Sequence, residues 1–211
     1  VPSVPVRCIQ VDAPNGMYLA GKHLVPTHNS EMLLAMARLY HRSSLLLRRT
    51  YPQLEDSLIT RSRQLYGKTE HYNAGKHAWE WTEEGRRIRF GHLADDAAID
   101  DYFSAQFDFI GFDEVTQFTE KQYTYLIARA RTSLSTQRVR IMCATNPVGA
   151  GVEWVMRRWA PWLQRGYANP AQPGELRWFV MLNDRDTEVD SSTPFVREGV
   201  TYTPRSRTYI P

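Results

Sequence analysis

The chain has 211 residues, of which 42% are hydrophobic and 23% are charged, a balance typical of soluble globular proteins. This composition excludes a disordered or fibrous protein, and a net charge of +3 is too small for a protein that coats nucleic acid by charge alone. The sequence contains no apolar run long enough to span a membrane and does not begin like a signal peptide, so we expect neither a membrane protein nor a secreted one.

The sequence predicts only short strands before residue 30 and a series of helices and strands after it. Before it, alternation and turn residues predict short strands at 6–11, 17–20 and 24–25. After it, the spacing of apolar residues predicts helices at 31–42, 52–65, 119–132 and 153–164, and strands at 44–49, 79–82, 86–90, 107–112 and 139–144. The strands at 79–82 and 86–90 should form a hairpin, and Thr119 should cap the third helix. Strands that alternate with helices predict an α/β fold with a mostly parallel sheet flanked by helices.

The four residues Thr27-His28-Asn29-Ser30, which we call the seam, carry side chains that can cleave or modify the backbone between them. An asparagine amide nitrogen can attack its own backbone carbonyl and cleave the next peptide bond, if a neighbour such as His28 polarises the carbonyl or protonates the leaving group. The hydroxyl of Ser30 can accept an acyl chain before that cleavage. A polar turn is the alternative interpretation of the same residues.

The segment CIQVDAPNGMYLAGKHLVPTHNS resembles the C-terminal end of an intein, the last two splicing blocks of the Hint fold. This resemblance implies that Asn29 is the cyclising residue, His28 the penultimate histidine and Ser30 the first residue of the C-terminal extein. Cys8 stands where these families often have aspartate. With Thr27 it resembles the subclass in which this cysteine is the first branching nucleophile, and the alternative is a small buried apolar residue.

Two further features of the sequence bear on splicing. Gly16 stands where many inteins have a second histidine, and the first intein blocks do not occur in the sequence. We therefore expect splicing to require an N-terminal intein and extein half from elsewhere, either because the intein is split or because the sequence is truncated. The two cysteines, Cys8 and Cys143, form no disulfide framework and suit a reducing compartment, the cytoplasm of a bacterial host.

Two strand ends after residue 100 carry the residue types of a nucleotide site. The run FDFIGFDE at 107–114 is an apolar strand that ends in Asp113 and Glu114, the pattern of a Walker B strand. In such a site Asp113 holds Mg²⁺ and Glu114 orients or deprotonates the attacking water. Asn146, in the CATNP run after the next strand, can sense the γ-phosphate. Solvated strand ends and an Asn-Pro turn are the alternatives.

The order of these segments closely resembles the ATPase domain of tailed-phage terminase large subunits, over residues 30–182. Its most specific segments are TYPQL, GFDEVTQF and ATNP. The resemblance implies a P-loop NTPase fold of the ASCE type, ATP and Mg²⁺ as cofactors, and double-stranded DNA, the portal and the small terminase subunit as partners. It also implies a ring of identical subunits when the protein is complete.

In that family a glycine-rich loop that ends in Gly-Lys directly precedes a Ser or Thr and a helix. Ser30 would therefore be the Walker A hydroxyl that ligates Mg²⁺, and the intein would interrupt the P-loop between its Lys and Ser30. The predicted organisation is an intein segment at 1–29, an ATPase domain without the Gly-Lys pair at 30–182, and a polar linker at 183–211 toward an absent nuclease domain. We expect the fragment to be inactive until it is joined.

Several basic and aromatic residues have two interpretations each. Arg48 and Arg49 follow a strand, and one of them, Arg49 in our assignment, would contact phosphate; the alternative is a surface cation. Arg129 and Arg131 would act across a subunit boundary or lie on a solvated helix face. Tryptophans and arginines of the fourth helix would touch DNA or, more in keeping with their spacing, pack in the core. These are Trp154, Arg157, Arg158, Trp159 and Trp162.

Two other functions fit the same sequence. The intein half would be the functional entity if the ATPase part were inert cargo. Alternatively, the chain would belong to a different P-loop ATPase, such as a helicase. The sequence upstream of the seam distinguishes these possibilities from an interrupted terminase.

Overall fold

A computed structural model of the chain describes residues 29–67, 69–146, 148–183 and 185–210, with the backbone of two short strands before them. These strands, β1 (Tyr18–Ala20) and β2 (Val25–Thr27), pair antiparallel. The chain divides into two compact units, one of which spans Ala13–Val152 while the other contains Glu153–Pro211. No helix among the described residues is both long and apolar enough to cross a bilayer.

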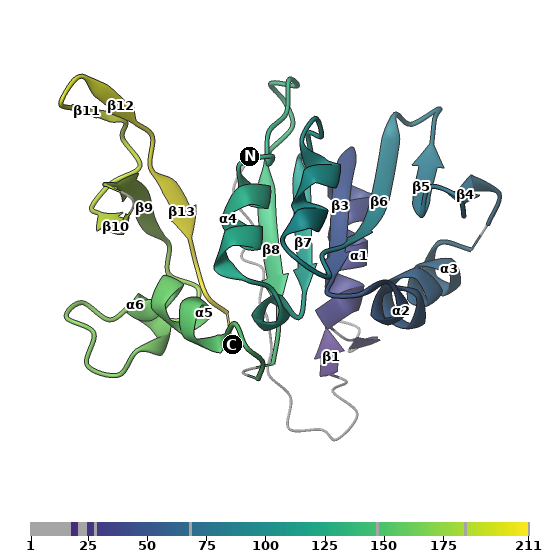
Figure 1. The fold of residues 1–211 in the computed structure, drawn as a ribbon, viewed down its shortest axis with the longest axis horizontal. Helices are drawn as coiled ribbons and strands as arrows, with labels where there is room; N and C mark the ends of the chain where they lie inside the picture. Colours follow the sequence, from purple (N-terminus) through teal and green to yellow (C-terminus); the bar gives the residue numbers. More distant parts are fainter. Residues whose placement is uncertain are drawn as a thin grey trace. The chain divides into compact units, whose positions relative to one another are not determined.

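The first unit is built on a six-stranded sheet with the order β4-β5-β6-β3-β7-β8 (Figure 1). Its strands are β3 (Ser43–Arg48), β4 (Tyr72–Asn73), β5 (Ala78–Trp81), β6 (Arg86–His92), β7 (Phe109–Asp113) and β8 (Arg140–Ala144). The four strands β6, β3, β7 and β8 are parallel, and β5 pairs antiparallel with β6. The predicted α/β fold with a mostly parallel sheet and the predicted hairpin are confirmed.

The helical segments of this unit agree with the expected positions, apart from their ends. They are α1 (Asn29–Tyr40), α2 (Tyr51–Leu54), α3 (Thr60–Tyr66), α4 (Glu120–Ile127), a π-helix at Glu55–Ile59 and short 3₁₀ turns at Thr69–His71, Ala97–Tyr102 and Val115–Gln117. The helix expected at 52–65 therefore contains a π-turn. The helix expected to run to residue 132 ends at Ile127, because Ala130 forms a β-bridge with Phe107 instead.

The core on one face of the sheet lies between α1 and the strands. Leu33 and Leu34 of α1 are fully buried in the same cluster as Leu46 of β3 and Phe109 of β7. Gly111 of β7 allows this close approach, since a Cβ atom there would lie 2.6 Å from Leu46 Cδ2. The helix is thus held over the sheet in a fixed position, and its N-terminus lies at the carboxyl edge of the parallel strands.

The other face of the sheet is covered near β7 by the segment that includes α4. Phe112 of β7 is fully buried, and its ring lies 5.4 Å from that of Phe118 and 5.2 Å from that of Tyr123. Thr119 caps α4 as predicted, because its Oγ1 accepts a hydrogen bond from Gln122 N at 3.1 Å while Gln122 Oε1 accepts one from Thr119 N. This cap orients α4 relative to the end of β7.

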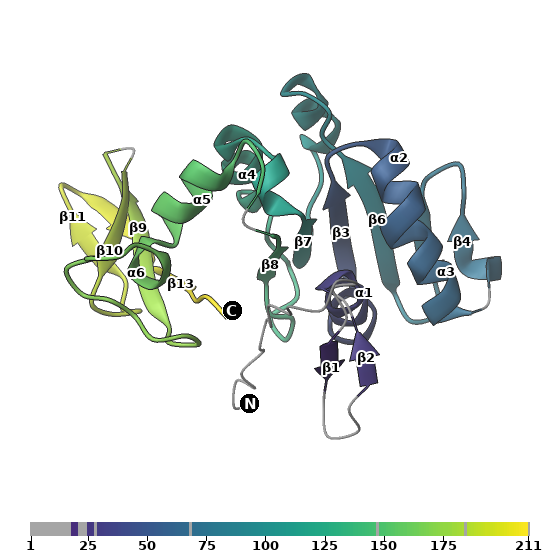
Figure 2. The ribbon, with the colours of Figure 1, turned by 90° about the horizontal axis from the view of Figure 1, so that it is seen from below.

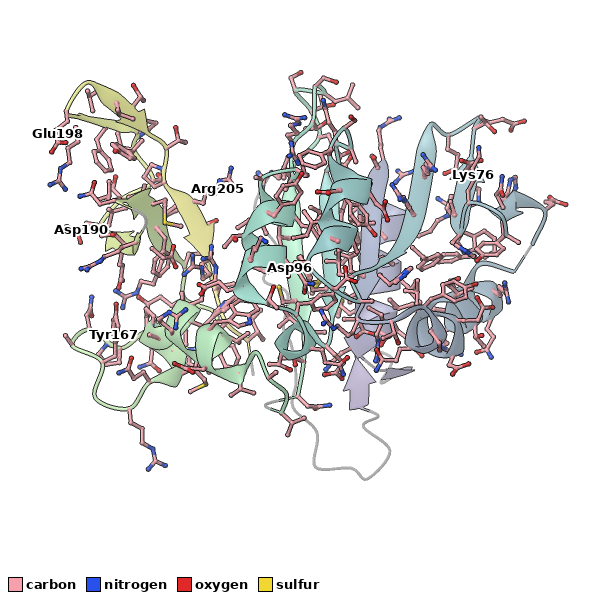
Figure 3. All side chains as sticks on the ribbon, in the orientation of Figure 1. Lys76, Asp96, Tyr167, Asp190, Glu198 and Arg205 are labelled. Carbon is pink, nitrogen blue, oxygen red and sulfur yellow. The ribbon has the colours of Figure 1, made fainter. Side chains whose placement is uncertain are left out.

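Asp108 fixes the start of β7 against the start of β3. Its carboxylate is 2% exposed and accepts hydrogen bonds from Arg42 N at 3.0 Å and from Ser43 N at 3.1 Å. We expect Asp108→Ala to lower the free energy of unfolding by about 2–5 kcal/mol, because two backbone N–H groups lose a charged acceptor. Urea unfolding measures this loss. Asp190→Ala, at an exposed position labelled in Figure 3, is the control, and equal midpoints for the two variants would contradict the role of Asp108.

The second unit contains two helices and two small sheets (Figure 2). Its helices are α5 (Val152–Arg158), which begins at the last residue of the first unit, and α6 (Ala160–Leu163), and its strands are β9 (Arg177–Leu182), β10 (Arg185–Val189), β11 (Phe195–Arg197), β12 (Val200–Tyr202) and β13 (Arg205–Arg207). Strand β9 pairs with both β10 and β13. The single helix expected at 153–164 is interrupted at Trp159, just before Pro161, which has no N–H to donate.

The segment at 183–211, for which the sequence predicts a polar linker and no helix or strand, contains the strands β10, β11, β12 and β13. Strands β10 and β13 flank β9, and Asp186 of β10 joins Arg207 of β13 through two hydrogen bonds of 2.7 and 3.0 Å. Neither strand has a buried face, so neither shows the alternation of apolar residues on which a prediction depends. Pairing with β9 orders them instead.

Candidate functional site

Three side chains from distant parts of the chain meet at the carboxyl edge of the parallel strands. Ser30, in the first turn of α1, donates a hydrogen bond of 2.9 Å from Oγ to Asp113 Oδ2 at the end of β7. Arg48, at the end of β3, donates from Nε to the same oxygen at 2.7 Å. Asp113 is 2% exposed, whereas Ser30 and Arg48 are half-buried, so both hydrogen bonds are partly buried. The edge therefore holds a hydroxyl, a carboxylate and a guanidinium within one hydrogen-bonded group.

This group has the character of a phosphate and magnesium site. The N-terminus of an α-helix carries partial positive charge and free N–H groups that favour a phosphate. Mg²⁺ binds in proteins through one or two carboxylates, hydroxyls, waters and substrate phosphates. The described residues include no group of three or more His, Cys, Asp or Glu side chains that could hold a metal ion.

Glu114 lies directly after Asp113 and is held in an unusual backbone conformation. Its φ of 59° and ψ of 59° are in the left-handed region, which is unfavourable for a residue with a Cβ atom. Its carboxylate accepts hydrogen bonds from Thr145 Oγ1 at 3.3 Å, from Asn146 N at 3.2 Å and from Asn146 Nδ2 at 3.4 Å. The structure thus brings the predicted residues Glu114 and Asn146 together across neighbouring strands.

Thr116 joins the loop after β7 to the loop after β8. Its Oγ1 lies 2.7 Å from Thr145 Oγ1 and donates to Val148 O at 2.6 Å, and its carbonyl accepts a hydrogen bond from Gly151 N at 2.7 Å. Gly149 has a φ of +126°, and a Cβ atom on it would lie 2.9 Å from Thr116 O. Thr116 and Thr145 therefore position Glu114 and Asn146, although neither threonine was among the residues singled out from the sequence.

We expect Thr116→Val to lower the free energy of unfolding by about 1–3 kcal/mol, because the buried loop contacts lose their hydroxyl while the shape of the side chain is kept. Thr124→Val is the matched control, since the Thr124 hydroxyl donates only to Glu120 O and Lys121 O near its own helical turn. Thermal or urea unfolding of the two variants measures the difference. A loss no larger than that of Thr124→Val would show that Thr116 does not hold the two loops together.

Arg49 lies next to Arg48 but faces another part of the unit. Its Nη1 donates to Leu93 O at 2.7 Å and to Gln122 Oε1 at 3.0 Å, and so joins the end of β3 to the start of α4. Arg48 rather than Arg49 contacts Asp113. Arg129 and Arg131, the second arginine pair singled out from the sequence, also differ in their surroundings. Arg129 donates to the Tyr125 hydroxyl at 2.8 Å, whereas Arg131 is exposed.

The tryptophans of the 153–164 segment favour the core interpretation. Trp154 and Trp159 are 7% and 8% exposed, which leaves little of their rings for a partner. Their spacing along the helices predicted this burial.

The splicing seam is only partly described by the structure. Asn29 is the first residue of α1, and its Oδ1 is buried without a hydrogen-bond partner among the described residues. Thr27 ends β2, where its backbone pairs with that of Tyr18. Cys8, Gly16 and His28 lie outside the described residues. The predicted roles of these residues therefore stay predictions.

Comparison with known proteins assigns the chain to a family. The family model for the phage terminase large subunit matches residues 27–189, which is most of the chain. A stretch of 38 residues is 55% identical to part of the replicative DNA helicase DnaB of Mycobacterium leprae (strain TN). That stretch covers 18% of this chain and 6% of the helicase, so the chain spans only a small part of that relative's length. The matched range includes α1, the Asp113 edge and the loop with Asn146, and the chain belongs to the phage terminase large subunit family.

Proposed function

We propose that residues 30–182 are the ATPase part of a terminase large subunit, a motor of P-loop NTPase type that drives double-stranded DNA into phage proheads. The family match supports this activity, together with the portal and the small terminase subunit as partners. The proposal also includes a ring of identical subunits when the protein is complete. The observation that carries the proposal is the 2.9 Å hydrogen bond between Ser30 Oγ and Asp113 Oδ2, which joins residues 83 positions apart.

Ser30 and Asp113 are the residues that would hold Mg²⁺ with the phosphates of ATP. Bound there, Mg²⁺ would neutralise charge on the phosphate oxygens and so favour phosphoryl transfer. Glu114 would orient the attacking water and accept its proton, and Asn146, hydrogen-bonded to Glu114, would link the state of the phosphate to this residue. Arg48 donates a hydrogen bond to Asp113, whereas Arg49 donates to Leu93 O, so Arg48 is better placed than Arg49 to contact a phosphate.

The test of this activity is the release of phosphate from ATP by the chain joined to its N-terminal half. The half is needed because Thr27-His28-Asn29, rather than Gly-Lys, directly precedes Ser30. We propose that hydrolysis requires Mg²⁺, increases with duplex DNA and stops when EDTA is added. An unchanged rate of hydrolysis in the presence of EDTA would contradict a site in which Ser30 and Asp113 hold Mg²⁺.

We further propose that residues 1–29 are the C-terminal segment of an intein whose removal completes the P-loop. In this reaction the Cys8 sulfur first attacks the carbonyl carbon that joins the N-extein to the intein, so that a thioester forms, this peptide bond breaks and the released intein amine takes the proton. Ser30 Oγ then attacks the thioester carbonyl, so that the acyl chain becomes an ester on Ser30 and the Cys8 thiol is released with the proton of the hydroxyl. The Asn29 side-chain nitrogen attacks the Asn29 carbonyl carbon, the peptide bond to Ser30 breaks, and the proton passes to the released Ser30 amine with help from His28. The ester then rearranges to a peptide bond.

Two observations support the intein proposal. The family match begins at residue 27, close to the seam, and leaves most of residues 1–29 outside the terminase range. The Asn29 Oδ1 atom is buried without a described partner, as expected if its partner is contributed by the rest of the intein. Co-expression with the N-terminal half tests the proposal: a ligated product that lacks residues 1–29 supports it, and unjoined halves with an intact Asn29–Ser30 bond oppose it.

A DNA helicase is the second candidate function. The match of 38 residues to a replicative helicase, at 55% identity, favours this function, and a helicase would use the same type of ATP site. The terminase match extends over a much longer range, 27–189, and we therefore prefer the packaging motor. An unwinding assay with forked DNA distinguishes the two, because a packaging motor moves along duplex DNA without separating its strands.

A further inference from the structure

One side of the β5–β6 hairpin is basic, while the other side packs in the core. On β6, Ile88 and Phe90 are 1% and 3% exposed, whereas Arg87 is exposed and Arg89 is half-buried. Successive residues of a strand point to opposite faces, so the two arginines share the face that is turned away from this core. Figure 1 shows β6 and β5 in view, with no helix drawn in front of them.

Two cavities adjoin this basic surface, one near the start of β6 and one near its end. A cavity of about 560 Å³ lies where β3 and β6 begin, and four arginines line it: Arg42, Arg86, Arg87 and Arg131. A second cavity of about 330 Å³ is lined by basic residues that include Lys76, His77, Arg87, Arg89 and His92. Arg87 lines both, so the two cavities adjoin at this residue, and we call their combined lining the arginine face. It is distinct from the carboxyl edge, where Ser30 meets Asp113.

The acidic residues of the arginine face do not neutralise it. Glu80 is shared between two cations, with Arg87 Nε at 3.3 Å and Lys76 Nζ at 3.6 Å. The carboxylate of Asp108, which lines the larger cavity, accepts hydrogen bonds from two backbone N–H groups. Asp101 is the one acidic residue among those that line the smaller cavity. Arg86 is paired with Glu84, whose Oε2 lies 3.4 Å from Arg86 Nε. The lining residues still include more arginine and lysine than glutamate and aspartate, so a surplus of positive charge remains.

Two guanidinium groups of the larger cavity are available to a ligand. Among the described residues, Arg42 Nη1 donates to the carbonyl of Glu84 alone, at 3.3 Å, and the Arg131 side chain makes no ion pair. Ser43, Thr132 and Ser133 line the same cavity with hydroxyl groups. Guanidinium and hydroxyl donors together are the usual partners of phosphate oxygens.

We propose that the arginine face binds the phosphates of duplex DNA during packaging. This inference rests on the proposed function, in which DNA is the substrate of the motor. Arg87 and Arg89 lie about 7 Å apart along the strand, since each residue advances about 3.3 Å, and the two cavities extend the row beyond them. A row of cations of this length suits a continuous phosphate backbone better than the few phosphates of a free nucleotide, and such contacts carry no sequence preference.

The experiment measures the binding of a fluorescent DNA duplex to the full chain by anisotropy, over a series of salt concentrations. We expect Arg87→Ala with Arg89→Ala to weaken binding to all duplex sequences alike. The slope of log K against log salt should become shallower by about 2, because two phosphate contacts are lost. Arg87→Lys with Arg89→Lys should retain most of the slope, since the charges remain. Arg165→Ala with Arg197→Ala, at exposed positions of the other unit, is the control.

Each outcome of this experiment has a defined meaning. If the alanine pair binds like the control pair and unfolds at the same temperature, DNA lies elsewhere and the arginine face is refuted, while the packaging function stands. If inorganic phosphate or ATP displaces DNA at concentrations where sulfate of equal ionic strength does not, the face binds free phosphates instead. If the unaltered chain shows no salt-dependent binding, both the face and the DNA partner of the proposed function are contradicted.

Discussion

Glu114→Gln in the joined protein should bind ATP as tightly as the unaltered protein does and hydrolyse it about 10²–10⁴ times more slowly. The amide keeps the size of the side chain and one oxygen for Thr145 and Asn146, which hold the carboxylate at 3.2–3.4 Å. It cannot accept a proton from water at neutral pH, so the chemical step is lost while the binding of phosphate and Mg²⁺ is kept. Phosphate release and nucleotide titration measure the two properties separately.

The control for this variant is Glu83→Gln, which changes an exposed glutamate in the turn between β5 and β6. It should hydrolyse ATP at the unaltered rate. Normal turnover by Glu114→Gln would refute the assignment of Glu114 as the water-orienting residue. Loss of ATP binding together with turnover would instead indicate that Glu114 supports the fold of the loop, in line with its left-handed backbone.

Asn29→Ala should abolish cleavage at the Asn29–Ser30 bond. Alanine has no side-chain nitrogen to form the succinimide, so no other group in the chain can replace that step. Mass spectrometry of the co-expressed halves should then show an accumulated branched or unjoined species that retains residues 1–29. Asn169→Ala, at an exposed position of the second unit, should splice normally. Release of residues 1–29 from the Asn29→Ala chain would contradict the intein proposal.

Much of the fold follows from local patterns in the sequence. The apolar runs that become β3 and β7 are buried inside the parallel part of the sheet, where a strand needs apolar residues on both faces. The run that becomes β8 lies at the edge of the sheet and is mostly half-buried. The cap of α4 is equally local, because Thr119 and Gln122 satisfy each other's backbone groups within one turn. Asp113 was also identified from the sequence, through the acidic residues that follow an apolar strand, whereas Ser30 was assigned to the site by the resemblance to terminase large subunits.

Other features of the site depend on contacts that no local pattern records. Arg48 and Arg49 are adjacent arginines at one strand end, and only the packing of α4 and the loop at Leu93 determines which of them faces Asp113. Thr116 contacts Thr145 across 29 positions. Such pairs come together only when the sheet order is fixed, which explains why the sequence did not reveal them. Strands β10 and β13 were missed because neither has a buried face, and so neither shows an alternation of apolar residues.

The central claim is that the carboxyl edge around Ser30 and Asp113 is the ATP site of a terminase large subunit. A crystal structure of the joined protein with Mg²⁺ and a non-hydrolysable ATP analogue tests it most directly. We expect the phosphates over the N-terminus of α1, with Mg²⁺ near Ser30 Oγ and Asp113 and with Glu114 facing the γ-phosphate. An analogue bound at another place, such as the cavities of the arginine face, would contradict it.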